Sequence, residues 1–257
     1  AIPYYIIAAN AGHIKAAHNL GVEYHRLNNY KQALKWLKKS AKQGDTYSLI
    51  GVGLVYLSAQ NYEHAMATFK QAGKLGDSEG YYNLGVFYAD IKKYQDFNKS
   101  EQYFKKAIEM GNVKSVWVLG TLYEDKKEYE KAIEWYKKGF ALGSKDSVLR
   151  LGFFYWEVKK DYKQAIYWFK EGYEKLNCVS CAASIGNIYD VDLKNKEKAI
   201  KWYEIAAKQG HLNAIYNLGY LYQFSLKDKE KAIEWYKKAA KMGDTIAKER
   251  LKELGEK

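Results

Sequence analysis

The sequence predicts an all-α fold, an α-solenoid of about seven helix-turn-helix repeats plus a C-terminal capping helix, and three recurring patterns support this prediction. The first pattern is a glycine followed three residues later by a tyrosine. This pair occurs at Gly21/Tyr24, Gly53/Tyr56, Gly85/Tyr88, Gly120/Tyr123, Gly152/Tyr155, Gly186/Tyr189 and Gly219/Tyr222. Consecutive glycines stand 32 to 35 residues apart. This period is typical of small helical units that stack, because no single unit buries its own apolar face.

The second pattern is a triplet in which a bulky apolar residue stands four residues after one small residue and three before another. The triplets are Ala33/Leu37/Ser40, Ala65/Phe69/Ala72, Ser100/Phe104/Ala107, Ala132/Tyr136/Gly139, Ala165/Phe169/Gly172, Ala199/Tyr203/Ala206 and Ala232/Tyr236/Ala239. Spacings of four and three place all three residues on one helical face. Each repeat is therefore predicted to be two antiparallel helices, the first with the glycine and tyrosine and the second with the triplet.

The third pattern marks where the helices stop and start. A glycine follows the first small residue by eleven positions at Gly44, Gly76, Gly111, Gly143, Gly210 and Gly243, and Asn177 stands one place later in the fifth unit. Glycine and asparagine suit the left-handed residue after a helix. The next residue is an N-cap type at Asp45, Asp77, Asn112, Ser144 and Asp244. His13 and His211 hold the same place and are expected to be caps or turn residues.

The repeats run through the chain without a linker, and Pro3 is its single proline. One repeat domain is therefore predicted over residues 1–257. Residues 1–12 correspond to the second helix of a truncated repeat, 13–244 to seven repeats and 245–257 to a capping helix with a polar face. Because the chain begins inside a repeat and without methionine, we expect it to be a fragment. No apolar run approaches ~18 residues, so no membrane span is predicted.

The repeats resemble a known family. Leu20-Gly21-x-x-Tyr24 followed by Tyr30, Ala33, Leu37 and Ser40 is similar to a tetratricopeptide repeat. Lys231 to Gly243, with Trp235, resembles the signature of the Sel1-like branch, and Trp36, Trp135, Trp168 and Trp202 extend that likeness. The Gly-rich loop of Sel1-like units is absent, since the loop reads Arg26-Leu-Asn-Asn-Tyr30 in the first repeat. The resemblance implies a right-handed solenoid that acts as a protein-binding scaffold and is not an enzyme.

The resemblance also implies that the first helices line a concave groove, at positions six, three and two before the glycine and one, four and five after it. Basic residues stand there at Lys15, Arg26, Lys114 and Arg150, and acidic ones at Glu79, Asp90, Glu124, Asp125, Asp146, Glu157 and Asp190. The groove therefore carries four positive and seven negative charges, although the whole chain has a net charge of +12. A phosphate backbone requires the opposite sign. A basic protein or peptide partner is predicted, and nucleic acid is disfavoured.

The predicted groove also holds aromatic side chains, which commonly anchor partners. They are Tyr82, Trp117, Phe153, Trp156, Tyr216 and Tyr220. Asn83, Asn187 and Asn217 add amides able to pair with a peptide backbone. With Glu124, Asp146, Arg150 and Glu157 these residues make up the predicted partner site, centred on the fourth and fifth repeats. The alternative is that the aromatic rings only pack between adjacent repeats.

Three rival functions remain open. Cys178-Val-Ser-Cys181 at a helix start has the spacing of a redox or disulfide pair, although Cys181 also fills a small-residue place of the repeat. The Lys-Lys pairs, such as Lys237/Lys238, form either a solvated outer face or a polyanion site. A purely structural module would have no groove ligand. Two cysteines cannot supply an all-cysteine zinc site, and no phosphate loop or paired acid and base is found, so no cofactor, metal or catalytic residue is predicted.

Overall fold

The computed structural model describes residues 2–256, and across these residues every regular element is a helix. Contacts divide the chain into two compact units, one ending at Lys126 and the other beginning at Lys127. The first unit contains α1 (Ile2–Asn10), α2 (Ile14–Arg26), α3 (Tyr30–Ala41), α4 (Thr46–Ser58), α5 (Tyr62–Lys74), α6 (Ser78–Asp90), the 3₁₀ turn η1 (Lys92–Tyr94), α7 (Phe97–Glu109) and α8 (Lys114–Asp125).

The second unit contains α9 (Tyr129–Ala141), α10 (Lys145–Phe153), η2 (Phe154–Val158), α11 (Tyr162–Leu176), α12 (Val179–Asn187), η3 (Ile188–Asp192), α13 (Lys196–Lys208), α14 (Leu212–Tyr220), η4 (Leu221–Ser225), α15 (Lys229–Lys241) and α16 (Thr245–Glu253). The predicted helix pairs are confirmed. The prediction of one domain spanning the chain stays a prediction.

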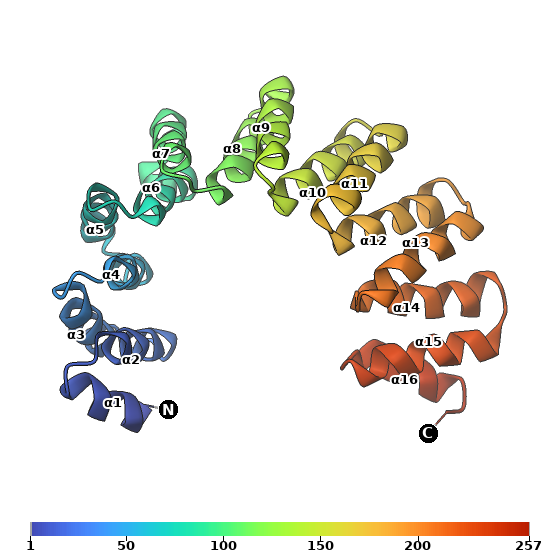
Figure 1. The fold of residues 1–257 in the computed structure, drawn as a ribbon, viewed down its shortest axis with the longest axis horizontal. Coiled ribbons are helices and arrows are strands. Elements are labelled where there is room, and N and C mark those ends of the chain that lie inside the picture. Colours follow the sequence, from blue (N-terminus) through green and yellow to red (C-terminus); the bar gives the residue numbers. More distant parts are fainter. Residues whose placement is uncertain (1, 257) are drawn as a thin grey trace. The chain divides into compact units, whose positions relative to one another are not determined.

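Within each unit the helices form two layers (Figure 1). The first helices of the repeats lie next to one another, with α2 against α4 in one unit and α10, α12 and α14 in succession in the other. We call this the first-helix layer. The second helices α3, α5 and α7 of the first unit, and α9, α11, α13 and α15 of the second, form the second-helix layer.

The recurring glycines lie where the two helices of a repeat touch. A Cβ atom added to Gly186 would stand 2.5 Å from a ring carbon of Tyr203, and one on Gly85 would stand 2.6 Å from the ring of Phe104. Both distances are shorter than a carbon–carbon contact of about 3.5 Å. The triplet residues are the core, since Ala199, Tyr203 and Ala206 are all buried. The role predicted for the glycines and triplets is therefore confirmed.

The predicted helix ends are also confirmed in most repeats. Gly210 has φ +77° and Asn177 has φ +50°, so both take the left-handed conformation. Ser144 accepts a hydrogen bond from the Ser147 amide at 3.1 Å, and Asp244 accepts one from the Ala247 amide at 2.9 Å. His13 and Asp45 are exceptions. His13 begins α2 without a side-chain hydrogen bond to the helix. Asp45 begins α4, but its carboxylate accepts hydrogen bonds from the Ser40 and Ser48 hydroxyls and does not cap the helix backbone.

The first helices of the last three repeats end in a π-helical turn that the sequence analysis did not predict. From signature glycine to first small residue, the fifth repeat (Gly152 to Ala165) is one residue longer than the first (Gly21 to Ala33). The widened turn takes up the extra residue. The hydrogen bond from the N-cap residue of the second helix to the signature tyrosine is kept. In the fifth repeat the Asp161 amide donates to the Tyr155 carbonyl at 2.8 Å, and in the first repeat the Asn29 amide donates to the Tyr24 carbonyl at 2.9 Å.

A left-handed residue that is not glycine precedes the second helix of every repeat except the third, where α7 follows the 3₁₀ turn η1. These residues are Asn28, Gln60, Lys127, Lys160, Lys194 and Lys227, with φ between +53° and +62°. A β-branched side chain is strained in this region. We therefore expect Lys227→Val to lower the free energy of unfolding by about 1–2 kcal/mol, whereas Lys227→Asn should stay within about 0.5 kcal/mol. Urea denaturation followed by circular dichroism checks this, and equal midpoints for the two variants would contradict it.

Candidate partner-binding site

The most complete part of the predicted site lies on the first-helix layer of the second unit. Phe153 of α10 and Trp156 of η2 are half-buried and stacked, with ring centroids 5.9 Å apart and planes 14° from parallel. Both pack edge-on against the buried ring of Phe169. The Trp156 indole N–H donates to the Asp192 carboxylate at 2.9 Å. The two rings are therefore partly covered by the second helix of their own repeat and partly exposed, and the next repeat fixes the orientation of Trp156.

Two amides of the predicted site meet on the neighbouring helices. The Asn217 side chain on α14 donates to Asn187 Oδ1 on α12 at 3.0 Å. The same oxygen accepts the hydroxyl of the buried Tyr203 at 2.7 Å. Burial, followed by the negative charge of Asp190, raises the pKa of Tyr203, so this hydroxyl remains a donor. Asn187 is therefore positioned by a core residue of its own repeat.

The aromatic residues of α14 continue into an exposed row. Tyr216, Tyr220 and Phe224 follow one another, with centroids 6.5 Å and then 4.6 Å apart. Tyr220 is 44% exposed and Phe224 39% exposed, whereas Tyr216 also packs against the core ring of Tyr236. The Arg250 guanidinium of α16 lies 5.4 Å from the Phe224 ring. Tyr216 therefore packs against the second helix of its own repeat, whereas Tyr220 is more exposed to solvent.

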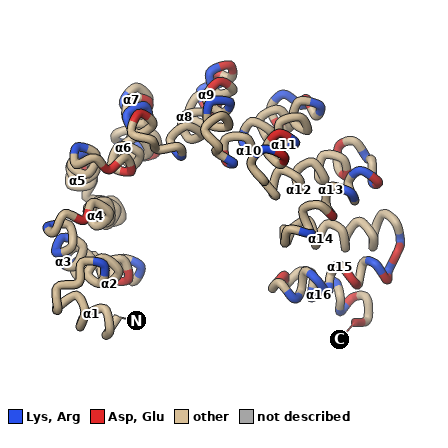
Figure 2. Tube along the Cα trace, viewed as in Figure 1, with Lys and Arg blue, Asp and Glu red and all other residues tan. Residues whose placement is uncertain are grey.

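The charges of this face are sparse. Figure 2 shows α12 and α14 almost without charged residues, while Lys, Arg, Asp and Glu gather on the second helices and turns. Asp146 and Glu157 are exposed, and so is Arg150. Asp190 forms an ion pair with Lys196. The acidic contribution of this unit therefore comes mainly from Asp146 and Glu157.

The remaining predicted residues lie in the first unit. The Tyr82 ring is half-buried 6.0 Å from Phe104, and burial, followed by the charge of Glu79, raises its pKa. The Asn83 amide donates to the Glu79 carbonyl of its own helix at 2.7 Å. Trp117 and Glu124 are half-buried on α8.

The sequence analysis missed three residues of this face. Asp192 orients Trp156 from the next repeat, six positions after Gly186, which is outside the assumed groove positions. Phe224 stands five after Gly219, which is one of those positions, so the pattern could have found it. Arg250 comes from α16, outside the seven repeats, and no repeat position predicts it.

The lysines of the second-helix layer lie against aromatic rings. Lys137 Nζ is 5.5 Å from the Trp168 ring centroid, Lys170 Nζ is 5.8 Å from that of Trp202, and Lys238 Nζ is 3.8 Å from that of Trp235. Such contacts contribute about 0.5–1 kcal/mol each at exposed sites. These lysines therefore lie over the tryptophan rings of the second helices.

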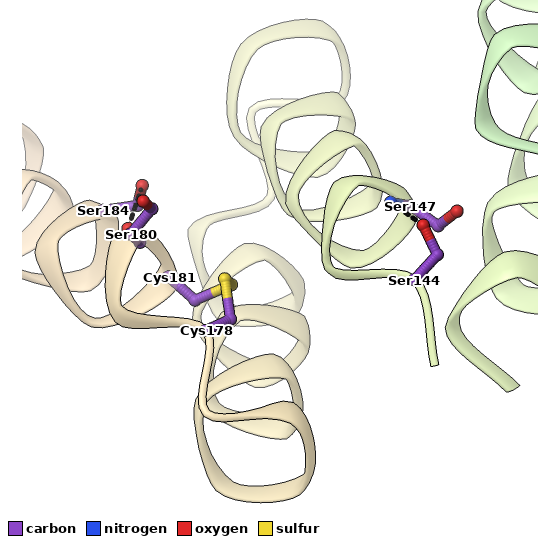
Figure 3. Close-up of a disulfide and its surroundings, with 6 residues drawn as sticks. All are labelled: Ser144, Ser147, Cys178, Ser180, Cys181 and Ser184. Atoms are coloured by element: carbon purple, nitrogen blue, oxygen red, sulfur yellow. Dashed lines mark hydrogen bonds between the residues drawn. A yellow bond between two sulfur atoms is a disulfide. The ribbon is translucent and has the colours of Figure 1, made fainter. Parts of the chain in front are cut away.

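The two cysteines are joined in a disulfide, and they are nearly inaccessible to solvent (Figure 3). Their Cα atoms are 5.3 Å apart. Cys178 begins α12 and makes no side-chain cap, and Cys181 lies in the first turn of that helix. The structure thus has the paired state that the sequence analysis left as an alternative.

Within residues 2–256 no group of three or more His, Cys, Asp or Glu side chains could hold a metal ion. No helix in the described part of the chain is long and apolar enough to cross a membrane.

His211 makes the start of α14, which carries Tyr216 and Tyr220, sensitive to pH. Its Nδ1 accepts the Ala214 amide at 3.3 Å, and burial lowers the pKa of the imidazole below its ordinary value of 6.5. A folded pKa below the unfolded one means that this stabilisation is complete above pH ~6.5 and is lost as the pH falls through the folded value. We expect His211→Asn, which keeps a cap, to show a smaller drop in urea midpoint between pH 7.5 and 5 than the wild type. An equal drop would contradict this.

Comparisons with known proteins agree with this architecture. The model of the Sel1 repeat matches residues 14–45, 78–112, 147–175, 190–211 and 212–244, more than half of the chain, and that of a tetratricopeptide repeat matches 113–142. A Sel1 repeat protein from Oxalobacter formigenes is 23% identical over 98% of this chain and 80% of its own, with a TM-score of 0.62. No curated protein matches the chain.

A second solved structure extends the comparison. A protective antigen of uropathogenic Escherichia coli strains, described as displaying an SLR fold, is 25% identical over 98% of this chain, with a TM-score of 0.48. The chain spans 66% of that antigen's length, just under two thirds. Sel1 and tetratricopeptide repeats generally serve as protein–protein interaction scaffolds and are typically not catalytic. The chain belongs to the Sel1 repeat family.

Proposed function

We propose that this protein is a scaffold that binds a basic or aromatic-bearing segment of a partner protein along its first-helix layer. The observation that carries the proposal is the stacked pair Phe153 and Trp156, half-buried and oriented by Asp192. Rings that are exposed yet fixed lose little conformational entropy on binding. Partly buried aromatic residues of this kind commonly supply most of the binding energy of an interface.

The charges around the rings define the partner's chemistry. Asp146 and Glu157 are exposed on the helix and turn that carry Phe153 and Trp156. A partner with lysine or arginine beside an apolar anchor complements this arrangement. The side-chain N–H groups of Asn187 and the side-chain oxygen of Asn217, which these two residues do not use in bonding to each other, would pair with the partner's backbone. Arg150 and Tyr220 lie on the same first-helix layer. In the first unit, considered by itself, Tyr82, Asn83, Trp117 and Glu124 are the residues proposed to contact a partner.

Charge reversal tests the proposal. The probe is the fluorescein-labelled peptide Lys-Arg-Phe-Lys-Arg, with binding followed by fluorescence anisotropy at 50 and 300 mM salt. We expect Asp146→Lys with Glu157→Lys to weaken binding about tenfold at low salt, because opposite charges steer and hold the peptide. The control is Glu174→Lys with Glu230→Lys, which makes the same change in charge on the second-helix layer. Absence of saturable binding, or equal weakening by the control, would contradict the proposal.

A redox-regulated adaptor is a second candidate, favoured by the Cys178–Cys181 disulfide. This disulfide closes the first turn of α12, and Asn187 ends the same helix. We expect reduction with dithiothreitol to weaken binding of the same peptide. Thiol titration confirms reduction, and Cys178→Ser with Cys181→Ser should mimic it. An affinity unchanged within twofold, with two free thiols, would exclude this candidate.

A further inference from the structure

A break in the aromatic pattern of the second helices opens a pocket that has no part in the proposed groove. The pattern concerns the residue that stands three positions after the first small residue of each triplet. In chain order these are Trp36, Thr68, Tyr103, Trp135, Trp168, Trp202 and Trp235. Six of the seven are aromatic, and only the second repeat has a small residue there.

At two places in the second unit this ring packs between successive second helices. In the second unit Trp168 of α11 packs edge-on against Phe140 of α9, with centroids 5.9 Å apart. Trp202 of α13 packs in the same way against Tyr173 of α11, at 6.0 Å. A lysine completes each site, since Lys137 lies over Trp168. At these two sites a tryptophan ring packs against a second aromatic ring, and a lysine ammonium lies over the tryptophan.

Between α3 and α5 both rings are missing. Ala41 holds the place of Phe140 and Tyr173, and Thr68 holds the place of the tryptophan. A cavity of about 340 Å³ results, lined by these two residues, by Val52 and Tyr56 of α4, and by other side chains of α3 and α5. Lys38, the counterpart of Lys137, has no tryptophan to cover, and its Nζ instead donates to the Tyr56 hydroxyl at 2.6 Å.

The chemistry of the lining indicates what fits. Val52 is buried beneath the cavity, and the Thr68 hydroxyl is already bonded to the His64 carbonyl at 2.7 Å, so it requires no further partner. The volume lies at the lower end of the range of about 300–1,000 Å³ seen for ligand sites. Lys38 and Lys42 stand at the rim, and among the described residues that line the cavity none carries a carboxylate.

We infer that this pocket receives an aromatic side chain, flanked by acidic residues, from a partner protein. The incoming ring takes the place of the missing tryptophan beside Thr68, and the Lys38 ammonium exchanges its hydrogen bond to the Tyr56 hydroxyl for a cation–π contact with that ring. The acidic neighbours pair with Lys38 and Lys42. This partner is opposite in charge to the one proposed for the first-helix layer, so the two sites are tested independently.

The test uses the full chain and the peptide acetyl-Glu-Glu-(5-fluoro-Trp)-Glu-Glu-amide, followed by ¹⁹F NMR. We expect saturable binding with a Kd below about 1 mM. Thr68→Trp, which restores the repeat residue, should weaken binding at least tenfold and raise the melting temperature. Ala41→Phe fills the pocket from α3 and should weaken binding equally, which keeps the test decisive if either variant folds poorly. Thr68→Ser leaves the space open and should bind as the wild type does.

Charge is tested separately. Lys38→Glu with Lys42→Glu should weaken binding at least fivefold, and the matched change Lys237→Glu with Lys241→Glu, at the same repeat positions of α15, should not. The peptide with alanine in place of fluorotryptophan should not bind. The inference is overturned if no saturation is seen up to 5 mM, if Thr68→Trp binds within twofold of wild type, or if the alanine peptide binds as tightly.

Discussion

Tyr203→Ala is expected to lower the free energy of unfolding by about 3–5 kcal/mol, the range seen when a buried aromatic ring is truncated. Tyr203 is 1% exposed, and its ring fills the space left by Gly186 on the facing helix. Its hydroxyl also bonds to Asn187. Tyr203→Phe removes only that hydrogen bond and should lower the free energy by about 1 kcal/mol. Urea denaturation followed by circular dichroism measures both.

A double-mutant cycle gives this prediction its control. Gly186→Leu alone should lower the free energy of unfolding by about 1–3 kcal/mol, because its Cβ would stand 2.5 Å from the Tyr203 ring. In the Tyr203→Ala background the ring is gone, so the leucine should be tolerated or stabilising. Tyr167→Ala, an exposed tyrosine of α11, should change the midpoint little. Strict additivity of the two changes would show that Gly186 and Tyr203 are not in contact.

The repeat register was predictable because steric contacts dictate it. The close approach of Gly85 to Phe104 and the left-handed turns at Gly210 and Asn177 each restrict the residue type, so the sequence records them. The division after Lys126 could not be predicted, because no linker or change of composition marks it. The π-helical turns were also missed, since a one-residue insertion is equally compatible with a longer loop.

The candidate site was predictable only in part. Repeat positions predicted that Phe153, Trp156 and Tyr220 are at least partly exposed, because the first helices of the second unit lie in one layer. They could not show that Asn83 would donate to its own helix, since an asparagine can choose between local and external partners. They also could not predict the hydrogen bond between Trp156 and Asp192. It joins the Trp156 side chain of the fifth repeat to the π-helical turn η3 of the sixth repeat.

Trp156→Ala is expected to weaken binding of the basic probe peptide about 30-fold, which corresponds to about 2 kcal/mol. The indole offers the largest partly exposed ring of the second unit's first-helix layer, and Phe153 stacks on it, so truncation also frees its neighbour. Isothermal titration calorimetry with the unlabelled peptide measures the loss. Tyr167→Ala, which removes a ring exposed on the second-helix layer, is the matched control.

The contribution of orientation is separable from that of contact area. Asp192→Ala leaves the Trp156 ring in place but removes the acceptor of its N–H, so we expect a loss of several-fold through weaker preorganisation. Asp192→Asn retains an acceptor oxygen and should bind within about twofold of the wild type. Trp117→Ala with Trp156→Ala removes an anchor from each unit and should weaken binding at least as much as Trp156→Ala alone. If that double variant stays folded and binds within twofold of wild type, the first-helix layer is not the binding site.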